Sequence, residues 1–404
     1  MRVLHVLHMS LPFMAGYTIR SDYILRYQRD HGMSPAVVTS AQQMSGATLH
    51  EEINGICHWR TPELSGKQPP GVRELRLMHA LEGRVSAAIR EHRPDVVHAH
   101  SPMLVGLPAL IAARRAGLPL VYEVRDLWEN ASVDRGKFAE GSAQYRVARG
   151  AETLVFKQAD AVVTICEALR NEIEPRVGNR DALTVVANGV DSDRFAPREA
   201  PPATWEKWKL GGKKVIGYVG TFQPYEGLQT LIEAIRDIAR EVPEAHVVIT
   251  GAGGQESELK ACAKEKGVEH LVTFTGRVPH DEVFNIYAMA SLMVYPRIRT
   301  RVTELTTPLK PLEAMSMARA VMVSDVPAMG ELVRYGETGF VFKAGDVADL
   351  TKQCVEILKR PERLAEVGRD ARAWILKERQ WPTLLSGYAG IYERAVAGRA
   401  GRAG

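Results

Sequence analysis

The chain has 404 residues, of which 45% are hydrophobic, and its net charge is +4. That length and composition support two domain cores, while the charge is too small to indicate nucleic acid binding. No run of about 20 apolar residues predicts a membrane span, and the N-terminus continues directly into a strand, so we expect a cytoplasmic protein. The four cysteines are scattered without metal-ligand spacing, which predicts reduced thiols, no disulfide and no zinc.

The first half of the chain alternates short apolar runs with amphipathic stretches, which is the pattern of parallel βαβ units. Helices are predicted over 19–31 and 71–92. Strands are predicted at Arg2–His8, Ala36–Thr39, Val96–His100, Leu118–Tyr122, Ala161–Ile165 and Leu183–Ala187.

Two features of this half follow strand ends. A turn containing Gly16 and Tyr17 comes after the first strand, where glycine lets backbone approach a ligand, although a plain βα turn explains it equally. His98 and His100 lie two positions apart on one strand and so point the same way. We expect His98 in the core, and for His100 both burial and a place lining a cleft remain open.

Residues 70–150 carry twelve Lys and Arg against nine Asp and Glu. Such a surplus occurs on ordinary solvated helix faces. The alternative is contact with an anionic membrane surface, since basic helices bind such surfaces.

The boundary between two domains is expected in a segment with three prolines, Phe195-Ala-Pro-Arg-Glu-Ala-Pro-Pro-Ala203. We predict a first domain over 1–195, a linker over 196–204, a second domain over 205–375, and a C-terminal helix with a frayed tail over 376–404. The second half repeats the α/β pattern, so both domains are expected to be doubly wound sheets. Its predicted strands are Val215–Val219, Ala245–Thr250, Val272–Thr275, Leu292–Tyr295, Ala320–Val323 and Gly339–Phe342.

The second half has its own glycine turn, from Gly220 to Gly227, after its first strand. The later Gly251-Ala-Gly-Gly run lacks the G-x-G-x-x-G spacing of a dinucleotide site, so it is weak evidence for a dehydrogenase. No G-x-S-x-G, P-loop or H-E-x-x-H motif occurs, so the sequence gives no support for a serine hydrolase, a Walker-type ATPase or a zinc protease of the H-E-x-x-H class.

The stretch Thr306-Thr-Pro-Leu-Lys-Pro-Leu-Glu313 predicts a loop that turns into a helix at Pro311, because proline fixes φ and lacks an N–H. Free backbone N–H groups would gather beside Lys310, with the Glu313 carboxylate one turn away. An anion site and a simple helix cap are both consistent with this pattern. Further on, Trp374, Trp381, Tyr388 and Tyr392 predict an aromatic packing face on the C-terminal helix.

Several motifs taken together resemble the retaining glycosyltransferases of family four, over essentially the whole chain. They are Asp95-Val-Val-His-Ala-His-Ser101, Asn188-Gly-Val-Asp191, Val219-Gly-Thr-Phe222, Phe274-Thr-Gly-Arg-Val278 and Glu331-Leu-Val-x3-Glu337-Thr-Gly-Phe340. The resemblance implies the GT-B fold, with two facing Rossmann-like domains and a C-terminal helix that crosses back to the first. The Thr-Pro-Leu-Lys-Pro-Leu-Glu variant is similar to a subgroup from bacterial exopolysaccharide and surface-glycan pathways.

This resemblance implies a donor site for a nucleotide-diphosphate sugar, with Glu313 binding the ribose. The residues expected to bind the donor are Gly16, Tyr17, Gly220, Thr221, Phe222, Arg277, Val278, Arg301, Pro308, Leu309, Lys310 and Glu313.

The chain also departs from the family. The family's first carboxylate falls on Leu305, and the nearest replacement is Glu304. Arg125 stands where relatives often have histidine, and since arginine cannot act as a base, Asp126 or a donor phosphate oxygen would accept the proton. The catalytic candidates are therefore Glu304, Asp126, Arg125 and His100; an ion pair between strands is the alternative for the Arg125 segment.

Thr221 and Glu226 occupy the positions of the cationic pair that grips the diphosphate in many relatives. Lys310 must then carry more of that charge, with Arg297, Arg299 and Arg301 as further candidates.

The resemblance implies transfer of a hexose-type sugar to a carbohydrate or lipid-linked acceptor, with no metal or other cofactor. A front-face reaction, in which the leaving diphosphate accepts the acceptor's proton, requires no nucleophile and is our preferred mechanism. The alternatives are a GT-B nucleotide-sugar epimerase and a non-catalytic nucleotide-sugar-binding protein. We expect a cytoplasmic protein, with peripheral contact at the inner leaflet as a further option; donor base, acceptor, linkage and oligomeric state do not follow from the sequence.

Overall fold

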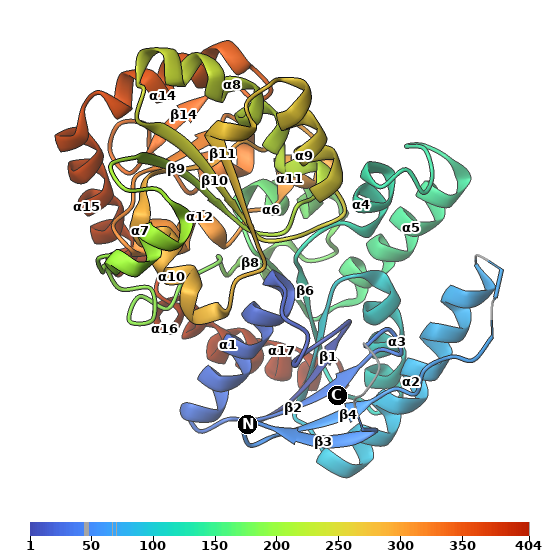
Figure 1. The fold of residues 1–404 in the computed structure, drawn as a ribbon. Helices are drawn as coiled ribbons and strands as arrows, with labels where there is room; N and C mark the ends of the chain where they lie inside the picture. Colours follow the sequence, from blue (N-terminus) through green and yellow to red (C-terminus); the bar gives the residue numbers. More distant parts are fainter. Residues whose placement is uncertain (44–47, 67, 70, 404) are drawn as a thin grey trace. The chain divides into compact units, whose positions relative to one another are not determined.

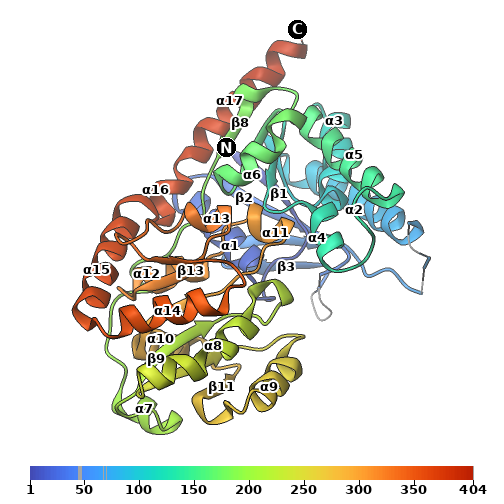
Figure 2. The same ribbon diagram turned by 90° about the horizontal axis from the view of Figure 1, so that it is seen from above.

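In the computed structural model the chain folds into two compact units, and residues 1–43, 48–66, 68–69 and 71–403 are described (Figures 1 and 2). Unit 1 combines Met1–Asn188 with the C-terminal segment from Pro382 onward, and unit 2 spans Gly189–Trp381. The observed division after Asn188 precedes the predicted linker at 196–204, because Val190 and Phe195 are already buried in the core of unit 2. The prolines of the predicted linker begin a helix, α7 (Pro202–Trp208).

Unit 1 is built on an eight-stranded sheet in the order β3-β4-β2-β1-β5-β6-β7-β8. All neighbouring strands are parallel except β3 and β4, which form an antiparallel hairpin. The strands are β1 (Arg2–Leu7), β2 (Ser34–Thr39), β3 (His50–Ile53), β4 (Ile56–Arg60), β5 (Val96–His100), β6 (Leu120–Val124), β7 (Ala161–Thr164) and β8 (Leu183–Val185).

The hairpin of β3 and β4 is absent from the sequence-based prediction. Its turn residues Asn54 and Gly55 both have positive φ, at 54° and 73°. Asn-Gly is the preferred pair for such a two-residue turn, so the signal was present in the sequence.

The helices of unit 1 are α1 (Gly16–Asp30), α2 (Val72–His92), α3 (Met103–Arg115), α4 (Trp128–Asp134), α5 (Ala143–Gln158), α6 (Glu167–Ile173) and α17 (Gly387–Ala403). The first begins at Gly16, three residues before the prediction, so Gly16 and Tyr17 lie in its first turn rather than in a loop. Helix α17 contacts β5 and β6, and it continues to Ala403 where fraying was expected. Its Tyr388 and Tyr392 are fully buried, as the aromatic pattern predicted.

Unit 2 has a six-stranded parallel sheet in the order β11-β10-β9-β12-β13-β14. Its strands are β9 (Lys214–Val219), β10 (Ala245–Thr250), β11 (Val272–Gly276), β12 (Ala290–Tyr295), β13 (Val321–Ser324) and β14 (Phe340–Phe342). Its longer helices and those near the charged side chains are α8 (Leu228–Glu241), α9 (Glu256–Glu265), α10 (His280–Met289), α11 (Arg301–Leu305), α12 (Lys310–Ser316), α14 (Val347–Leu358) and α15 (Pro361–Glu378). Helix α16 (Trp381–Leu385) begins at the last residue of unit 2 and continues into unit 1. The doubly wound α/β fold predicted for both halves is confirmed.

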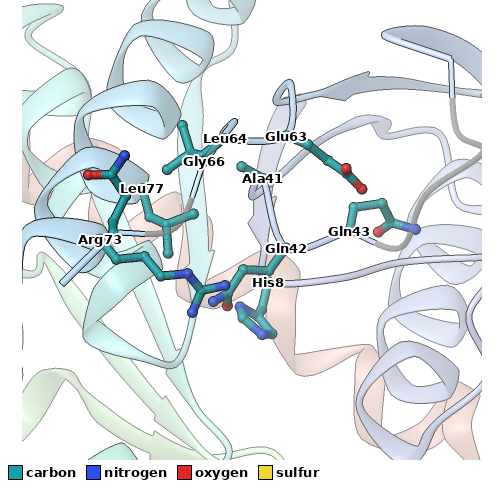
Figure 3. Close-up of a pocket in the computed structure, with 10 residues that line it drawn as sticks. His8, Ala41, Gln42, Gln43, Glu63, Leu64, Gly66, Arg73 and Leu77 are labelled. Carbon is teal, nitrogen blue, oxygen red and sulfur yellow. The ribbon is translucent and has the colours of Figure 1, made fainter. Parts of the chain in front are cut away.

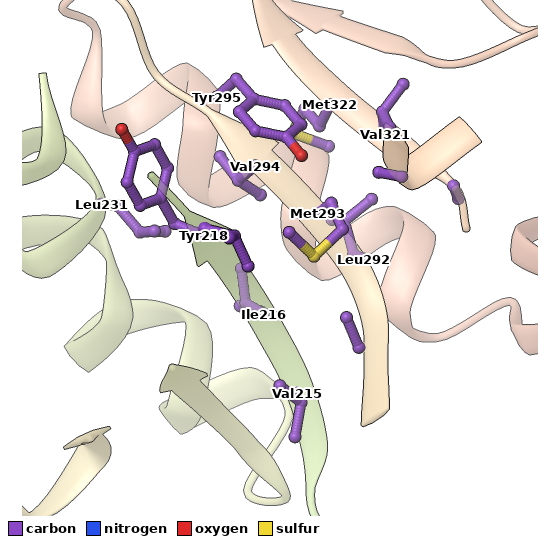
Figure 4. Packing of buried hydrophobic residues seen from close by; sticks show 14 of the residues in the cluster. Val215, Ile216, Tyr218, Leu231, Leu292, Met293, Val294, Tyr295, Val321 and Met322 are labelled. Atoms are coloured by element: carbon purple, nitrogen blue, oxygen red, sulfur yellow. The ribbon is translucent and has the colours of Figure 1, made fainter. Parts of the chain in front are cut away.

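Buried side chains of β9 and β12, the two central strands of unit 2, belong to one hydrophobic core (Figure 4). A Cβ added at Gly217 in β9 would lie 2.6 Å from the Met293 sulfur of β12. Tyr218 and Tyr295 project from these same strands at their carboxyl ends, with ring centroids 6.1 Å apart. Interiors of this density hold side chains in fixed positions, so the loops that follow β9 and β12 start from a rigid base.

The chain order of the strands marks where each unit should bind ligands. In unit 1 the order reverses between β1 and β5, and in unit 2 it reverses between β9 and β12. Open α/β sheets bind ligands outside the carboxyl ends of their strands at such switch points. None of the helices in the described residues has the length and hydropathy of a membrane span.

Candidate functional site

Glu123 is the centre of a buried polar network in unit 1. It lies in β6 with no exposed surface, and its Oε1 accepts hydrogen bonds from Arg20 Nε at 3.0 Å and Arg125 Nε at 2.7 Å. The Tyr388 hydroxyl of α17 donates to its Oε2. Burial by itself would raise the pKa of this carboxyl, but Arg20, Arg125 and His100 together bring it well below its usual range. Glu123 is therefore a fixed negative charge.

Arg125 uses most of its donors inside unit 1. Besides Glu123, it donates to the backbone oxygen of Tyr17, to Ser21 Oγ at 2.9 Å and to His100 Nδ1 at 2.7 Å. Its guanidinium also lies over the Tyr17 ring, 4.4 Å from the centroid. Only 7% of Arg125 is exposed, and these contacts hold its guanidinium in a fixed position.

The hydrogen bond from Arg125 fixes the protonation of the neighbouring histidines. A guanidinium can only donate, so we assign His100 Nδ1 as an acceptor and Nε2 as the protonated nitrogen. His100 Nε2 then donates to His5 Nδ1 at 3.0 Å, and His5 Nε2 donates to Gln28 Oε1 at 2.8 Å.

The same chain of donors continues to the C-terminal helix. Gln28 Nε2 donates to the Tyr392 hydroxyl at 2.7 Å, which in turn donates to His98 Nδ1 at 2.8 Å. His98 Nε2 is left as the protonated nitrogen, 3.6 Å from Glu123 Oε2 and without a hydrogen-bond partner among the described residues. This series of hydrogen bonds thus ends beside Glu123, the carboxylate that holds Arg125. We call these residues the histidine network: His5, Gln28, His98, His100, Glu123, Arg125 and Tyr392.

All three imidazoles are neutral. Burial lowers the pKa of His5 to about 3 and that of His100 to about 4, with positive neighbours contributing, and it lowers the pKa of His98 well below its usual value. Their ring nitrogens lie within 4.8 Å of one another, a spacing that three metal ligands could have. However, a metal would need the lone pair at His100 Nε2, which carries the proton once Arg125 occupies Nδ1. The donor set therefore does not fit a metal as it stands.

His100, predicted as a catalytic candidate, is fully buried and is held by Arg125 and His5. Asp126, one residue beyond Arg125, remains the accessible candidate of this segment: it is half-buried and accepts a hydrogen bond of 3.4 Å from Ser101 Oγ. Burial raises the pKa of its carboxyl, against the influence of Arg135, which makes it a stronger proton acceptor than an ordinary aspartate.

A second cluster of charges lies in unit 2, beyond the ends of β9 and β12. Glu226, 3% exposed, accepts hydrogen bonds from Lys310 Nζ at 2.8 Å and from Arg297 Nη2 at 3.2 Å. Lys310 Nζ also lies 2.8 Å from the Tyr218 hydroxyl. Burial alone would raise the pKa of Glu226, but Arg297 and Lys310 lower it to about 2. The cluster of Arg297, Glu226 and Lys310 therefore carries one net positive charge.

This arrangement refines the expected role of Lys310. The sequence placed Glu226 where relatives have a cation and left Lys310 to supply the charge, with Arg297 among the further candidates. The structure pairs both Lys310 and Arg297 directly with Glu226. The Lys310 side chain also lies across Gly220: a Cβ there would be 2.5 Å from Nζ. A larger residue at position 220 would require the end of the Lys310 side chain to move.

Glu313 is not a helix cap. Its carboxylate accepts a hydrogen bond of 2.8 Å from the Tyr287 hydroxyl, and α12 has no side-chain cap. Only Oε2 is used in this contact. Burial raises the pKa of the Glu313 carboxyl, with the Tyr287 hydrogen bond opposing. The helix begins at Lys310, one residue before the prediction, and has seven residues.

Glu304 lies in α11 between two arginines. Its Oε1 is 3.9 Å from Arg299 and its Oε2 is 3.8 Å from Arg301, while Arg299 also pairs with Asp325 at 2.9 Å. Arg299 and Arg301 are thus paired with carboxylates of unit 2, as Arg297 and Lys310 are with Glu226.

The remaining predicted donor residues lie in loops of unit 2. Phe222 is 1% exposed and belongs to the core, so its side chain does not line a site, although neighbouring Thr221 is exposed. Arg277 is exposed and Val278 half-buried after β11, and Pro308 and Leu309 are half-buried before α12. The Gly251 run has a packing role: a Cβ at Gly251 would be 1.9 Å from the Gly220 oxygen.

The sequence analysis did not predict four residues that form the buried polar interior of unit 1. Three belong to the histidine network and the fourth, Arg20, pairs with Glu123; the four are His5, Arg20, Gln28 and Glu123. The signals were a glutamate inside an apolar strand and an arginine on the apolar side of α1. Because buried charged groups usually pair with an opposite charge, a contact between this glutamate and this arginine could have been predicted.

Two family models match the chain. Residues 15–189 match the glycosyl transferase 4-like domain, and residues 213–360 match the glycosyl transferases group 1. Among curated relatives, a GDP-mannose-dependent alpha-(1-6)-phosphatidylinositol monomannoside mannosyltransferase of Mycolicibacterium smegmatis is 31% identical over 247 residues, covering 60% of this chain and 64% of the relative. The chain thus aligns with less than two thirds of that protein's length.

Solved structures show a similar fold. The sucrose-phosphate synthase of Thermosynechococcus elongatus has a TM-score of 0.79 at 16% identity, covering 98% of this chain and 99% of the other. HepE of Anabaena in complex with UDP has a TM-score of 0.72 at 20% identity, covering 96% and 99%. At these identities the likeness concerns the fold alone.

Proposed function

Because residues 15–189 and 213–360 belong to two glycosyltransferase domain families, and the fold is that of GT-B glycosyltransferases, we propose that this protein transfers a sugar from a nucleotide-diphosphate donor to an acceptor hydroxyl. The observation that carries the proposal is that the two domain matches fall, one each, on the two doubly wound units. The donor is a hexose-type nucleotide sugar, and the acceptor is a carbohydrate or a lipid-linked sugar.

The unit 2 cluster supports a donor site there. Lys310 and Arg297 supply two positive charges and Glu226 removes one, which leaves a net charge suited to a diphosphate. Glu313 Oε1 is not used by Tyr287 and can accept a hydrogen bond from a ribose hydroxyl. By their names, one relative depends on GDP-mannose and one structural neighbour holds UDP, so the relatives support the class of donor without selecting its base.

For the mechanism we favour the front-face route with retention of configuration. Glu304 has an arginine within 4 Å of each carboxylate oxygen, so it would have to leave these ion pairs to attack an anomeric carbon. Asp126 has a raised pKa and is better suited to accept or relay a proton. The leaving diphosphate would accept the acceptor's proton, with Lys310 and Arg297 stabilising the charge that develops on it.

Unit 1 offers a surface for a lipid-linked acceptor. Val147 and Leu154 of α5 are 73% and 49% exposed, and Arg146 and Lys157 are exposed on the same helix. Apolar side chains next to basic ones suit an anionic lipid surface. Co-sedimentation with anionic vesicles, compared with neutral vesicles, tests this contact.

The activity is tested by incubating the full chain with UDP-, GDP- and ADP-sugars and a panel of soluble and lipid-linked acceptors. Formation of a glycosylated product together with free nucleotide supports the proposal. Release of free nucleotide with an epimerised sugar and no acceptor product identifies an epimerase instead. Donor binding without any turnover identifies a binding protein.

A further inference from the structure

A cavity of about 220 Å³ lies in unit 2 at the amino ends of three neighbouring strands. Lys214 is the first residue of β9, Ser291 is the second residue of β12, and Ala320 directly precedes β13. The charged cluster around Glu226 lies beyond the opposite, carboxyl ends of β9 and β12. Because β12 has six residues, its two ends are about 17 Å apart, at about 3.3 Å per residue. The cavity is therefore separate from the proposed donor site.

Two cations and, among the described residues, no acid line this cavity. The cations are Lys214 and Arg319, and neither forms an ion pair within the described part of the chain. A larger cavity of about 450 Å³ in unit 1 differs in this respect, because its wall contains Glu63 as well as Arg73 (Figure 3). The unit 2 cavity thus has positive charge that no carboxylate of its own wall balances.

Arg319 is half-buried and has no opposite charge beside it. Burial lowers the pKa of its guanidinium, and no carboxylate counteracts this effect. A guanidinium nevertheless stays protonated in proteins, so the positive charge remains in a partly apolar site. Holding a charge there without a counterion costs free energy, and a bound anion would reduce that cost.

The polar side chains of the cavity retain donors that no described residue uses. Arg319 donates from Nε and from Nη1 to two backbone oxygens, both at 3.3 Å, which leaves Nη2 unused. Lys214 Nζ donates to the Leu358 oxygen at 3.1 Å and has two further N–H groups. The Ser291 hydroxyl has no hydrogen-bond partner in the described part of the chain. Three side chains can therefore donate to one ligand.

Capping of helix ends is the alternative role for the two cations. The three backbone oxygens that they contact lie at the C-terminal ends of α10, α12 and α14. Each helix C-terminus carries about half a negative charge, whereas the N-terminus of α15, which borders the cavity at Pro361, carries about half a positive charge. These helix ends together offset about one of the two full charges of Lys214 and Arg319. About one positive charge therefore remains for a ligand.

We propose that this cavity binds a phosphate group, with Lys214, Arg319 and Ser291 donating hydrogen bonds to its oxygens. A phosphate monoester carries about 1.5 to 2 negative charges at pH 7 and has three terminal oxygens, whereas a carboxylate has one charge and two oxygens. The volume is below the roughly 300 Å³ at which sites for larger ligands begin, so it suits inorganic phosphate or a small phosphate ester better than a nucleotide sugar. Leu358 and Leu364 also line the cavity and would contact the organic part of an ester.

Calorimetric titration of the full chain with inorganic phosphate and with glycerol phosphate tests the proposal, with glycerol and acetate as the comparisons. We expect both phosphates to bind, and we expect neither glycerol nor acetate to bind. A lower Kd for glycerol phosphate than for inorganic phosphate identifies a phosphate ester as the ligand. Equal Kd values identify free phosphate.

Variants of the lining residues locate the bound phosphate. Lys214→Met and Arg319→Met should each raise the Kd about tenfold or more, because each removes a charged donor, and Ser291→Ala should raise it about threefold. Exposed residues of unit 2 outside the cavity provide the matched controls, which are Lys352→Met, Arg236→Met and Ser257→Ala. These control variants should bind phosphate as the wild type does.

A second measurement uses the wild-type chain, because loss of a helix-capping cation can impair folding. Acetylation of Lys214, followed by peptide mass spectrometry, should become slower when phosphate is present, while acetylation of the exposed Lys352 should not change.

The proposal is overturned if phosphate does not bind, if acetate binds equally well, or if cavity and control variants have the same Kd. An unchanged acetylation rate at Lys214 also overturns it. Phosphate binding that is lost in Lys310→Ala and kept in Lys214→Met and Arg319→Met would place the anion in the donor cluster instead. None of these measurements uses a sugar donor, so the phosphate site and the transferase function can fail independently.

Discussion

The Tyr388 hydroxyl donates a hydrogen bond to the carboxylate of Glu123, which joins a helix near the end of the chain to the middle of the unit 1 sheet. The same hydroxyl accepts a hydrogen bond of 3.2 Å from Arg20, the other partner of Glu123. Helix α17 therefore completes the polar interior of unit 1.

We expect Tyr388→Phe to lower the free energy of unfolding by about 1 to 3 kcal/mol, because it removes one donor from a buried carboxylate. Urea denaturation followed by circular dichroism measures the change. Tyr335→Phe is the control, since Tyr335 is 66% exposed. Equal midpoints for the two variants would show that the Tyr388 contact contributes nothing.

We expect Lys310→Ala to reduce kcat/KM for the donor at least about tenfold, because it removes a cation from the unit 2 cluster. Steady-state kinetics at varied donor concentration provides the measurement. Lys352→Ala, at an exposed lysine of α14, should have wild-type kinetics. Unchanged kinetics for Lys310→Ala would exclude Lys310 from donor binding.

The stability of unit 1 should depend on pH through Glu152 in α5. Its carboxylate accepts hydrogen bonds from the Tyr122 hydroxyl and from the Met103 N–H, and burial, helped by Glu129, raises its pKa from 4.5 to about 8. Since the folded-state pKa is the higher one, its contribution to stability is fully present below about pH 4.5 and is lost as the pH rises through about 8.

Glu152→Gln should remove this dependence. Between pH 5 and pH 8 the variant should gain stability relative to the wild type by up to about 1.4 kcal/mol per pH unit. Urea midpoints at several pH values give the difference, in which other titrating groups cancel. Glu140→Gln, at an exposed position, should track the wild type throughout. A constant difference between Glu152→Gln and the wild type would contradict the raised pKa.

A front-face mechanism predicts no covalent sugar on the protein. Intact-mass spectrometry of the acid-quenched enzyme, taken during turnover with donor and acceptor, should show only the unmodified chain. Peptide mapping should find Asp126 and Glu304 free. A glycosyl adduct on either carboxylate would replace the front-face route by double displacement.

Activity should be retained in EDTA, because the proposed diphosphate site uses Lys310 and Arg297 as its cations. Initial rates with and without chelator test this, with added Mg²⁺ and Mn²⁺ as the comparison. Loss of activity in EDTA that either ion restores would require a metal at the donor.

The sequence was a good guide to the elements and a partial guide to the site. Every strand predicted from apolar runs is present, because burial between helix layers demands such runs. Glu226 shows what the sequence could not predict. It occupies a position where many relatives have a cation, which suggested that this positive charge is missing. Only the fold shows that Arg297, in the loop after the neighbouring strand β12, contacts Glu226. His100 is a second case. The sequence correctly indicated that His98 and His100 lie on one strand. It could not show that Arg125 and His5 enclose the His100 ring, because this contact joins elements that are distant in sequence.

Because unit 1 is assembled from both ends of the chain, its interior closes late during synthesis. All of unit 2 leaves the ribosome before Tyr388 and Tyr392 do. Until then Glu123 lacks its hydroxyl donor and Gln28 lacks its acceptor. We therefore expect unit 2 to reach its native state first on the ribosome, reversing the usual order in which N-terminal domains fold before later ones.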